Sequence, residues 1–193
     1  MKKFLFLLLL AGGIYWWQHE PPATWRGLPA SRDPVQLSTQ LPAPLKHGDY
    51  TIKPLARYEI KAVVLGRERY RYDDGANLSP VDLALGWGPM SSAGVINELN
   101  MSQSGRWYEY SWSEEPPLSP DLIAAHSANT HCIPASPAVR SQLLAIRRLD
   151  VVTLKGYLVE VGGPKGYSWR SSLSRTDTGG GACEVMWITA IEK

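Results

Sequence analysis

The sequence predicts an α+β fold that is mainly β: a small antiparallel sheet or an OB-like barrel with two short helices. Apolar and polar residues alternate with a period of two along several stretches, as in strands with one buried face. Clusters of Gly, Pro, Asn and Asp separate these stretches at hairpin length. The chain has 8 Trp and 9 Tyr against 2 Phe, and aromatic side chains with a polar tip suit strands and wet binding surfaces.

Residues 1–17 have the pattern of an export signal, because Lys2 and Lys3 precede an uncharged apolar run over residues 4–17. As a helix this run is about 21 Å long, shorter than the roughly 30 Å hydrocarbon core, which allows a cleaved signal peptide. No small-x-small cleavage pair follows Trp17, and Trp16 and Trp17 resemble interfacial aromatics. We therefore expect an uncleaved signal anchor, with the two lysines in the cytoplasm and the rest of the chain outside it.

Residues 18–48 are rich in proline and show no apolar periodicity. Such a segment is expected to be an extended, solvated linker that holds a folded unit away from the membrane. Residues 49–193 remain for a single β-rich globular domain, and about 145 residues is an ordinary size for one domain.

The first strand of that domain is expected over residues 50–72, where Tyr58 and Ile60 alternate with charged residues. Ser119 and Ser136 are each followed by a proline, the pattern that begins a helix. Helices are therefore expected over 119–126 and 136–146, and further strands over 81–90, 106–112, 150–161, 167–174 and 183–193.

The stretch "AAHSANTHCIPAS", residues 124–136, holds two of the four histidines and one of the two cysteines. Asn129 favours a turn, which His126 and His131 would brace by hydrogen bonds. In an exported domain an even pair of cysteines usually bridges, so we expect a disulfide between Cys132 and Cys183. A closed loop of this length contributes roughly 4 kcal/mol in the chain-entropy estimate.

Two further interpretations concern the same residues. A Cys2His2 metal site would need short paired ligand spacings, which this chain lacks, so we expect no metal and no cofactor. Hydrolysis would use His126 and His131 as catalytic residues, with Asp177 as a further candidate, because histidine transfers protons near neutral pH. No motif supplies a nucleophile, so a non-enzymatic role is favoured over this alternative.

The stretch "RTDTGGGACEV", residues 175–185, contains the Asp-Thr-Gly triplet of aspartic proteases. Only 14 residues follow Gly179, too few for the flap and floor of that site. The glycines favour a flexible turn, whose backbone N–H groups can bind an anion together with Arg170 or Arg175.

The block "AHSANTHCIPASPAVRSQLLAIRRLDVVTLKGYLVEV", followed by "WRSSLSRTDTGGGACEV", resembles an uncharacterised exported family of bacteria over roughly residues 50–193. The resemblance implies a protein of the bacterial cell envelope. Together with the apolar run over residues 4–17, it leads us to expect a domain anchored in the inner membrane and facing the periplasm, or one secreted to the periplasm. It implies no activity and no residue roles.

The sequence therefore predicts a tethered or exported domain that binds an envelope protein or glycan. Exposed aromatic side chains would supply its contact area. The net charge is only +2, which disfavours nucleic acid, although an OB-like binder of oligosaccharide or nucleic acid remains an alternative. The candidate contact residues are Trp87, Trp107, Trp112 and Trp169.

Overall fold

The computed structural model describes residue 27, residues 29–73 and residues 75–193. This part contains an 8-stranded sheet, a separate 2-stranded sheet and short helices, so the predicted α+β, mainly β class is confirmed. The expected signal anchor over residues 1–17 lies outside the described residues. Within the described ranges, no helix has both the length and the apolar character needed to cross a membrane.

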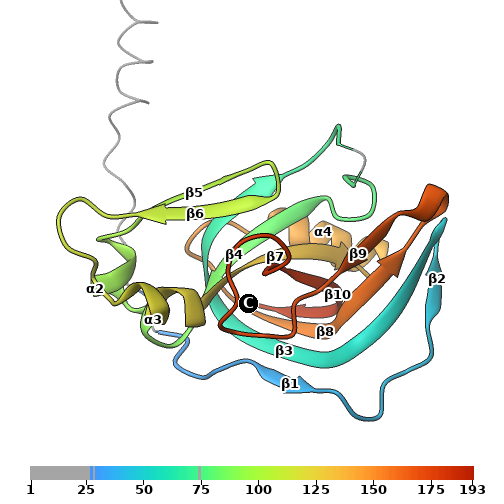
Figure 1. Cartoon of the computed structure of the whole chain (residues 1–193), viewed down its shortest axis with the longest axis horizontal. Helices are drawn as coiled ribbons and strands as arrows, with labels where there is room; N and C mark the ends of the chain where they lie inside the picture. Colours follow the sequence, from blue (N-terminus) through green and yellow to red (C-terminus); the bar gives the residue numbers. More distant parts are fainter. Residues whose placement is uncertain (1–26, 28, 74) are drawn as a thin grey trace, which may run out of the picture.

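Five strands of the described chain close into a barrel (Figure 1). Hydrogen bonds join them in the order β3-β4-β7-β10-β8, and β8 pairs again with β3. With a helix between the third and fourth barrel strands, this order is the connectivity of an OB-type barrel. The barrel strands are β3 (Tyr50–Arg69), β4 (Val81–Gly86), β7 (Ser127–Pro134), β8 (Val151–Gly162) and β10 (Glu184–Glu192).

One pair of barrel strands differs from the antiparallel sheet that the sequence predicts. β7 and β10 are parallel, whereas the other neighbours in the barrel are antiparallel. The connection between them contains a helix and the whole of β8, which is long enough to return the chain in the same direction. Both strands therefore begin at the same end of the barrel.

Alternation along β3 produces the barrel core. Tyr58, Ile60, Ala62 and Val64 are buried in one cluster with inward-facing residues of the other four strands. A register shift between Val64 and Gly66 then bends β3 from its pairing with β8 toward β4. The predicted strand over residues 50–72 is thus confirmed as the longest element of the fold.

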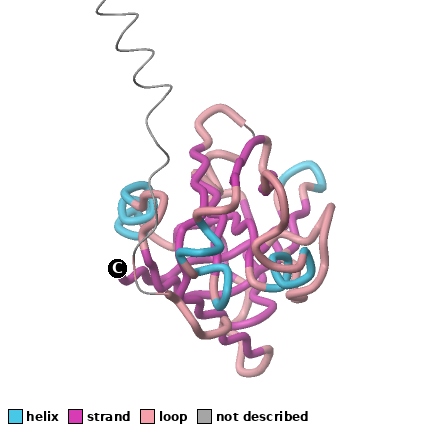
Figure 2. Tube along the Cα trace, turned by 90° about the vertical axis from the view of Figure 1, so that its left-hand side faces the viewer, coloured by secondary structure: helices cyan, strands magenta, loops and turns pink. Residues whose placement is uncertain are grey.

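The predicted helices begin where the sequence indicates. Ser119 and Ser136 are N-caps whose hydroxyls accept from the backbone N–H groups of Leu122 and Val139. These helices are α3 (Pro120–Ala125) and α4 (Pro137–Ala145). Figure 2 shows the short helices around the strands. The other helical segments are η1 (Gly88–Ser91), α2 (Ala93–Ile96) and η2 (Pro164–Gly166).

The segment predicted as a linker contributes to the sheet. β1 (Val35–Leu37) and β2 (Leu45–His47) both pair antiparallel with β3. Neither tripeptide contains proline, so each can offer its backbone N–H groups to a neighbouring strand. The domain therefore begins before residue 48, and only part of the 18–48 segment can act as a spacer.

The stretch "SANTHCIP" is a barrel strand, β7, and the turn predicted there is wrong. It pairs with β4 on one side and β10 on the other, and nearly all of its residues are buried. The polar residues that suggested a turn are satisfied inside the fold. Nε2 of Gln103 donates to the side-chain oxygen Oδ1 of Asn129, and Nδ1 of His131 donates to the carboxylate of Asp82.

Two insertions, a hairpin and a single short strand, lie between the barrel strands in sequence. The hairpin of β5 (Asn100–Ser104) and β6 (Trp107–Ser111) lies between β4 and β7 in sequence. β9 (Ser168–Arg170) pairs with the end of β8 and belongs to the connection that leads to β10. Both insertions reach the region where β7 and β10 begin, and their side chains build the cavities described next.

Candidate functional site

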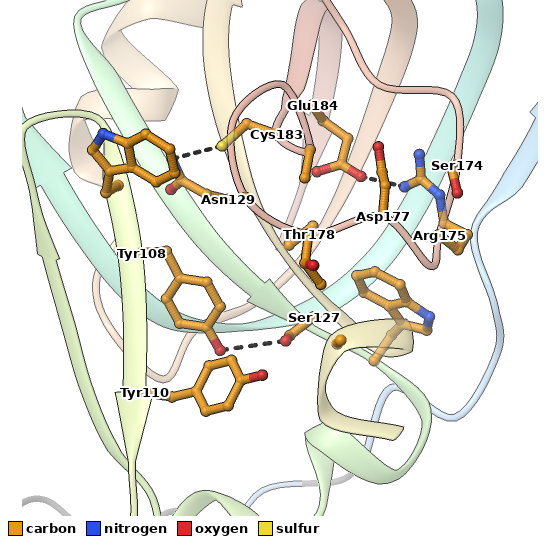
Figure 3. A pocket seen from close by; sticks show the side chains of 16 residues that line it. Tyr108, Tyr110, Ser127, Asn129, Ser174, Arg175, Asp177, Thr178, Cys183 and Glu184 are labelled. Carbon is orange, nitrogen blue, oxygen red and sulfur yellow. Dashed lines mark hydrogen bonds and ion pairs between the residues drawn. The ribbon is translucent and has the colours of Figure 1, made fainter. Parts of the chain in front are cut away.

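A cavity of about 170 Å³ lies where β7 and β10 begin and β4 ends, and we call it the mouth pocket (Figure 3). β6 contributes Tyr108 and Tyr110 to one wall, and residues 174–179 form another. Glu184, the first residue of β10, lies between these walls. Three separate parts of the chain therefore converge on one small cavity.

Glu184 has a buried carboxylate, and only one of its two oxygens has a hydrogen-bond partner among the described residues. Its residue is 2% exposed, and its Oε1 accepts from Nη1 of Arg175, which also donates to the Tyr58 hydroxyl. Burial raises the pKa of Glu184 to about 7, although the Arg175 guanidinium opposes this rise. Within the described chain, Oε2 has no hydrogen-bond partner.

Figure 3 shows how this carboxylate is oriented. Arg175 approaches Glu184 from one side, and the second carboxylate oxygen lies on the side away from Arg175. Two other nitrogen atoms of Arg175, Nε and Nη2, also lack partners among the described residues, and they are turned away from the cavity. Asp177, a second lining carboxylate, accepts from the Ser172 hydroxyl at 2.7 Å.

Aromatic rings form the opposite wall of the mouth pocket. Tyr108 and Tyr110 point to the same face of β6, with ring centroids 5.7 Å apart. The Tyr108 hydroxyl donates to Ser127 at 3.3 Å, which fixes the ring, and burial raises its pKa. Trp87 and Trp107 also line the cavity, the first buried and the second 51% exposed.

A second cavity, of about 580 Å³, lies on the outer face of the barrel, and we call it the side pocket. Its floor is an ion cluster around Asp82, which is fully buried. Arg106 donates to Oδ1 of Asp82 at 2.9 Å, and His131 Nδ1 donates to Oδ2 at 2.8 Å. Because a carboxylate only accepts hydrogen bonds, the proton of a neutral His131 lies on Nδ1. Nε2, which does not contact Asp82, is then the basic nitrogen of the ring.

Aromatic rings cover the ion cluster. The guanidinium of Arg106 lies 3.6 Å from the ring centroid of Tyr70, and the ring of Trp169 lies 4.5 Å from that of His131. Arg106 also pairs with Asp73 at the pocket edge. Both oxygens of Asp82 and the charge of Arg106 are therefore satisfied within the protein.

The two pockets adjoin. Trp107 and Cys183 line both of them, and Asn129 donates to the Cys183 sulfur at 3.9 Å. Burial raises the pKa of the Cys183 thiol to about 11, so the resting thiol is neutral. The two pockets lie beside the connections β3–β4 and β8–β10, the region that OB-type barrels use for oligomeric ligands.

The three predicted catalytic residues lie in separate places. His126 ends α3, and its Nδ1 bonds the Leu122 carbonyl oxygen at 2.9 Å. His131 is in the side pocket with Asp82, and Asp177 is in the mouth pocket with Ser172. The sequence reasoning expected a carboxylate near His131, but the structure supplies Asp82 in that place.

Of the predicted contact residues, Trp87 and Trp107 line the mouth pocket, and Trp107 and Trp169 line the side pocket. Trp112 stacks near Tyr110 outside both. Arg170 lines the side pocket and pairs with Glu160, while the charge of Arg175 is directed to Glu184. The two arginines therefore do not converge with the glycine turn on one anion.

The predicted disulfide is wrong for this structure, in which Cys132 and Cys183 are both free. Cys132 points into the barrel core, whereas Cys183 lines the two pockets outside it. The partner of Cys132 on β10 is Met186, so the thiols are offset by three residues along parallel strands. That offset is about 10 Å, beyond the roughly 7 Å limit between bridged Cα atoms.

Sequence reasoning missed Asp82, Arg106 and Glu184. Period-two alternation offers a signal for Asp82 and Glu184, whereas Arg106 lies in the turn between β5 and β6, where alternation offers none. Asp82 interrupts the apolar run "VDLALG", and Glu184 falls on an inward position of the closing strand. A charged residue at a buried position of a strand needs a partner or a function. Among the described residues, no set of three or more His, Cys, Asp or Glu side chains is grouped so that it could bind a metal ion.

Comparison with protein-family models, with curated proteins and with solved structures finds no match to this chain. The fold and the candidate site therefore rest on the strand pairing and side-chain contacts given above.

Proposed function

We propose that this domain is a non-enzymatic binding module whose ligand is an oligosaccharide with little net charge. The observation that carries the proposal is that the mouth and side pockets adjoin, with Trp107 and Cys183 lining both. A ligand longer than one pocket could occupy both. The expected leader over residues 1–17 would place this domain outside the cytoplasm, at the bacterial envelope, where glycans are abundant.

The lining residues favour a sugar. Flat aromatic rings accept the apolar faces of a ligand, and the polar groups between them bind its hydroxyls. Asn129, Ser127 and Thr178 supply such groups in the mouth pocket. The six aromatic residues that line the two pockets are Trp87, Trp107, Tyr108, Tyr110, Tyr167 and Trp169.

The charge of the two pockets disfavours nucleic acid. A polyanion needs an excess of lysine and arginine along its path, because phosphate contacts dominate its affinity. Here the charged lining residues balance, three basic against three acidic. They are Arg106, Arg170 and Arg175 against Asp73, Asp177 and Glu184.

The test is a fluorescence titration of the purified full-length protein with a panel of oligosaccharides and with single-stranded DNA and RNA oligomers. We expect saturable quenching by at least one oligosaccharide, little dependence on salt, and loss of binding in Trp107→Ala. Binding only to the nucleic acids, weakened steeply by salt, would overturn the proposal.

Hydrolysis is a second candidate, favoured by one observation. Asp82 holds His131 in the side pocket, and Cys183 lines the same pocket. Nε2 of the imidazole would take the proton of the Cys183 thiol as sulfur attacks the ester carbon, and would return it to the alcohol that leaves. Water would then hydrolyse the thioester, releasing the acid and restoring the thiol. Turnover of an activated ester that is lost in Cys183→Ser and in His131→Ala would establish it, and equal rates in all three proteins would remove it.

A further inference from the structure

The mouth pocket has more capacity for a positive charge than for a negative one. Two carboxylates line it, Asp177 and Glu184, against the single guanidinium of Arg175. Nη1 of Arg175 is already shared between Glu184 and the Tyr58 hydroxyl. The unpartnered nitrogens of Arg175 are turned away from the cavity, so the charge left facing it is negative.

Glu184 supplies an independent sign that a ligand belongs here. Its residue is 2% exposed, and Oε2 has no partner within the described chain and lies on the side of the carboxylate away from Arg175. A buried carboxylate oxygen without a partner costs free energy, and a positive charge in the adjoining cavity would lower that cost by electrostatic attraction.

The opposite wall attracts cations for a different reason. The face of an aromatic ring carries partial negative charge, and cages of Trp and Tyr rings bind alkylated ammonium groups. Tyr108 and Tyr110 lie side by side across the cavity from Arg175 and Asp177 (Figure 3). Trp87 and Trp107 add two more rings to the lining.

The size of the cavity fits a small organic cation. Its volume of about 170 Å³ equals the space of about six water molecules. That space suits a trimethylammonium group with a short substituent. A bare metal ion would instead require several converging oxygen ligands, and the aromatic wall offers few.

We propose that the mouth pocket binds the alkylated ammonium group of an organic cation, held between the Tyr108–Tyr110 wall and the carboxylates of Glu184 and Asp177. The inference rests on the proposed function only in that the cation would be a substituent of the bound glycan. Glu184 then makes the site sensitive to pH near neutrality, because protonation removes the charge that faces the ligand.

The experiment measures binding of choline and tetramethylammonium to the full-length protein by isothermal titration calorimetry. The matched probe is 3,3-dimethyl-1-butanol, which has the shape of choline without its charge. We expect saturable binding of both cations at pH 8 and none of the neutral alcohol. Affinity should fall about tenfold as Glu184 is protonated below pH 7.

Variants locate the site. Tyr110→Leu should weaken choline binding about tenfold, whereas Tyr110→Phe, which keeps the ring, should retain it. Glu184→Gln should bind choline about tenfold more weakly at pH 8 and lose the pH dependence. Tyr72→Leu is the control, because Tyr72 is 95% exposed and lies outside both pockets. Thermal melts monitored by circular dichroism confirm that each variant folds.

The outcomes separate this inference from the proposed function. Equal binding of choline and the neutral alcohol, equal effects of Tyr110→Leu and Tyr72→Leu, or no cation binding at all would overturn the ammonium site. Cation binding without binding of any oligosaccharide would support the site and overturn the glycan proposal. Oligosaccharide binding that depends on Trp107, without cation binding, would support the glycan proposal and overturn the ammonium site.

Discussion

Asp82 and Glu184 are both buried carboxylates on barrel strands, and each contacts an arginine, but their surroundings differ. Both oxygens of Asp82 are paired, one with Arg106 and one with His131. Among the described residues only one oxygen of Glu184 has a partner, and burial raises the pKa of this carboxyl group to about 7. The comparison teaches that a complete cluster is typical of structure, whereas an incomplete one at a cavity indicates a binding site.

The largest expected effect comes from breaking the complete cluster. Asp82→Ala leaves the Arg106 guanidinium, whose side chain is 18% exposed, without its buried partner and removes the bond to His131. Removing one partner of a buried ion pair costs about 3–5 kcal/mol. We expect the free energy of unfolding, measured by urea denaturation, to fall by that amount.

Asp33→Ala provides the control for this loss. The Asp33 side chain is 78% exposed and lies 4.0 Å from His126, an arrangement worth at most about 1 kcal/mol. If the two variants lost equal stability, the Asp82 cluster would have no special structural role.

The incomplete cluster around Glu184 should make the free energy of unfolding depend on pH. The pKa of Glu184 is raised from 4.5 to about 7 in the folded state, so folding is favoured by protonation. The stability this group contributes is fully present below pH 4.5 and is lost as pH rises through 7. A shift of this size corresponds to about 3 kcal/mol.

We therefore expect wild-type protein to lose about 3 kcal/mol relative to Glu184→Gln between pH 4 and pH 8, as measured by urea denaturation at each pH. Glu192→Gln serves as control, because its side chain is 61% exposed. A constant difference between Glu184→Gln and wild type across this range would show that Glu184 titrates as an exposed carboxyl does.

The sequence predicted the barrel far better than the two pockets. Period-two alternation depends on local chemistry, so β3 and the capped helices α3 and α4 were found from their own residues. The pairing of Asp82 with His131 joins positions 49 residues apart, and alternation carries no information about which strands are neighbours.

The turn predicted at 124–136 failed for a related reason. Asn129 and His131 are polar, and in isolation they suggest an exposed loop. Both are buried in β7 because other segments supply their partners, Gln103 from β5 and Asp82 from β4. Long-range partners of this kind override local propensity, and only the folded chain reveals them.

Trp107 tests whether the two pockets act as one face. It lines both, and 51% of it is exposed, so we expect Trp107→Ala to change the free energy of unfolding by no more than about 0.5 kcal/mol. Oligosaccharide binding should nevertheless be lost. Retained oligosaccharide binding, or a large loss of stability, would mean that Trp107 does not join the pockets.

The smallest expected effect concerns the cysteines. A bridge between Cys132 and Cys183 would contribute roughly 4 kcal/mol, so a reductant would lower the melting temperature by many degrees. In this structure the thiols are free and lie on opposite sides of the barrel wall, so dithiothreitol should leave the melting temperature unchanged. Non-reducing mass spectrometry should find both thiols alkylated after unfolding, and only Cys183 accessible before it, because Cys132 is fully buried. An intramolecular bridge would require a different register between β7 and β10, which would move Glu184 away from the mouth pocket and remove the difference between the two carboxylates.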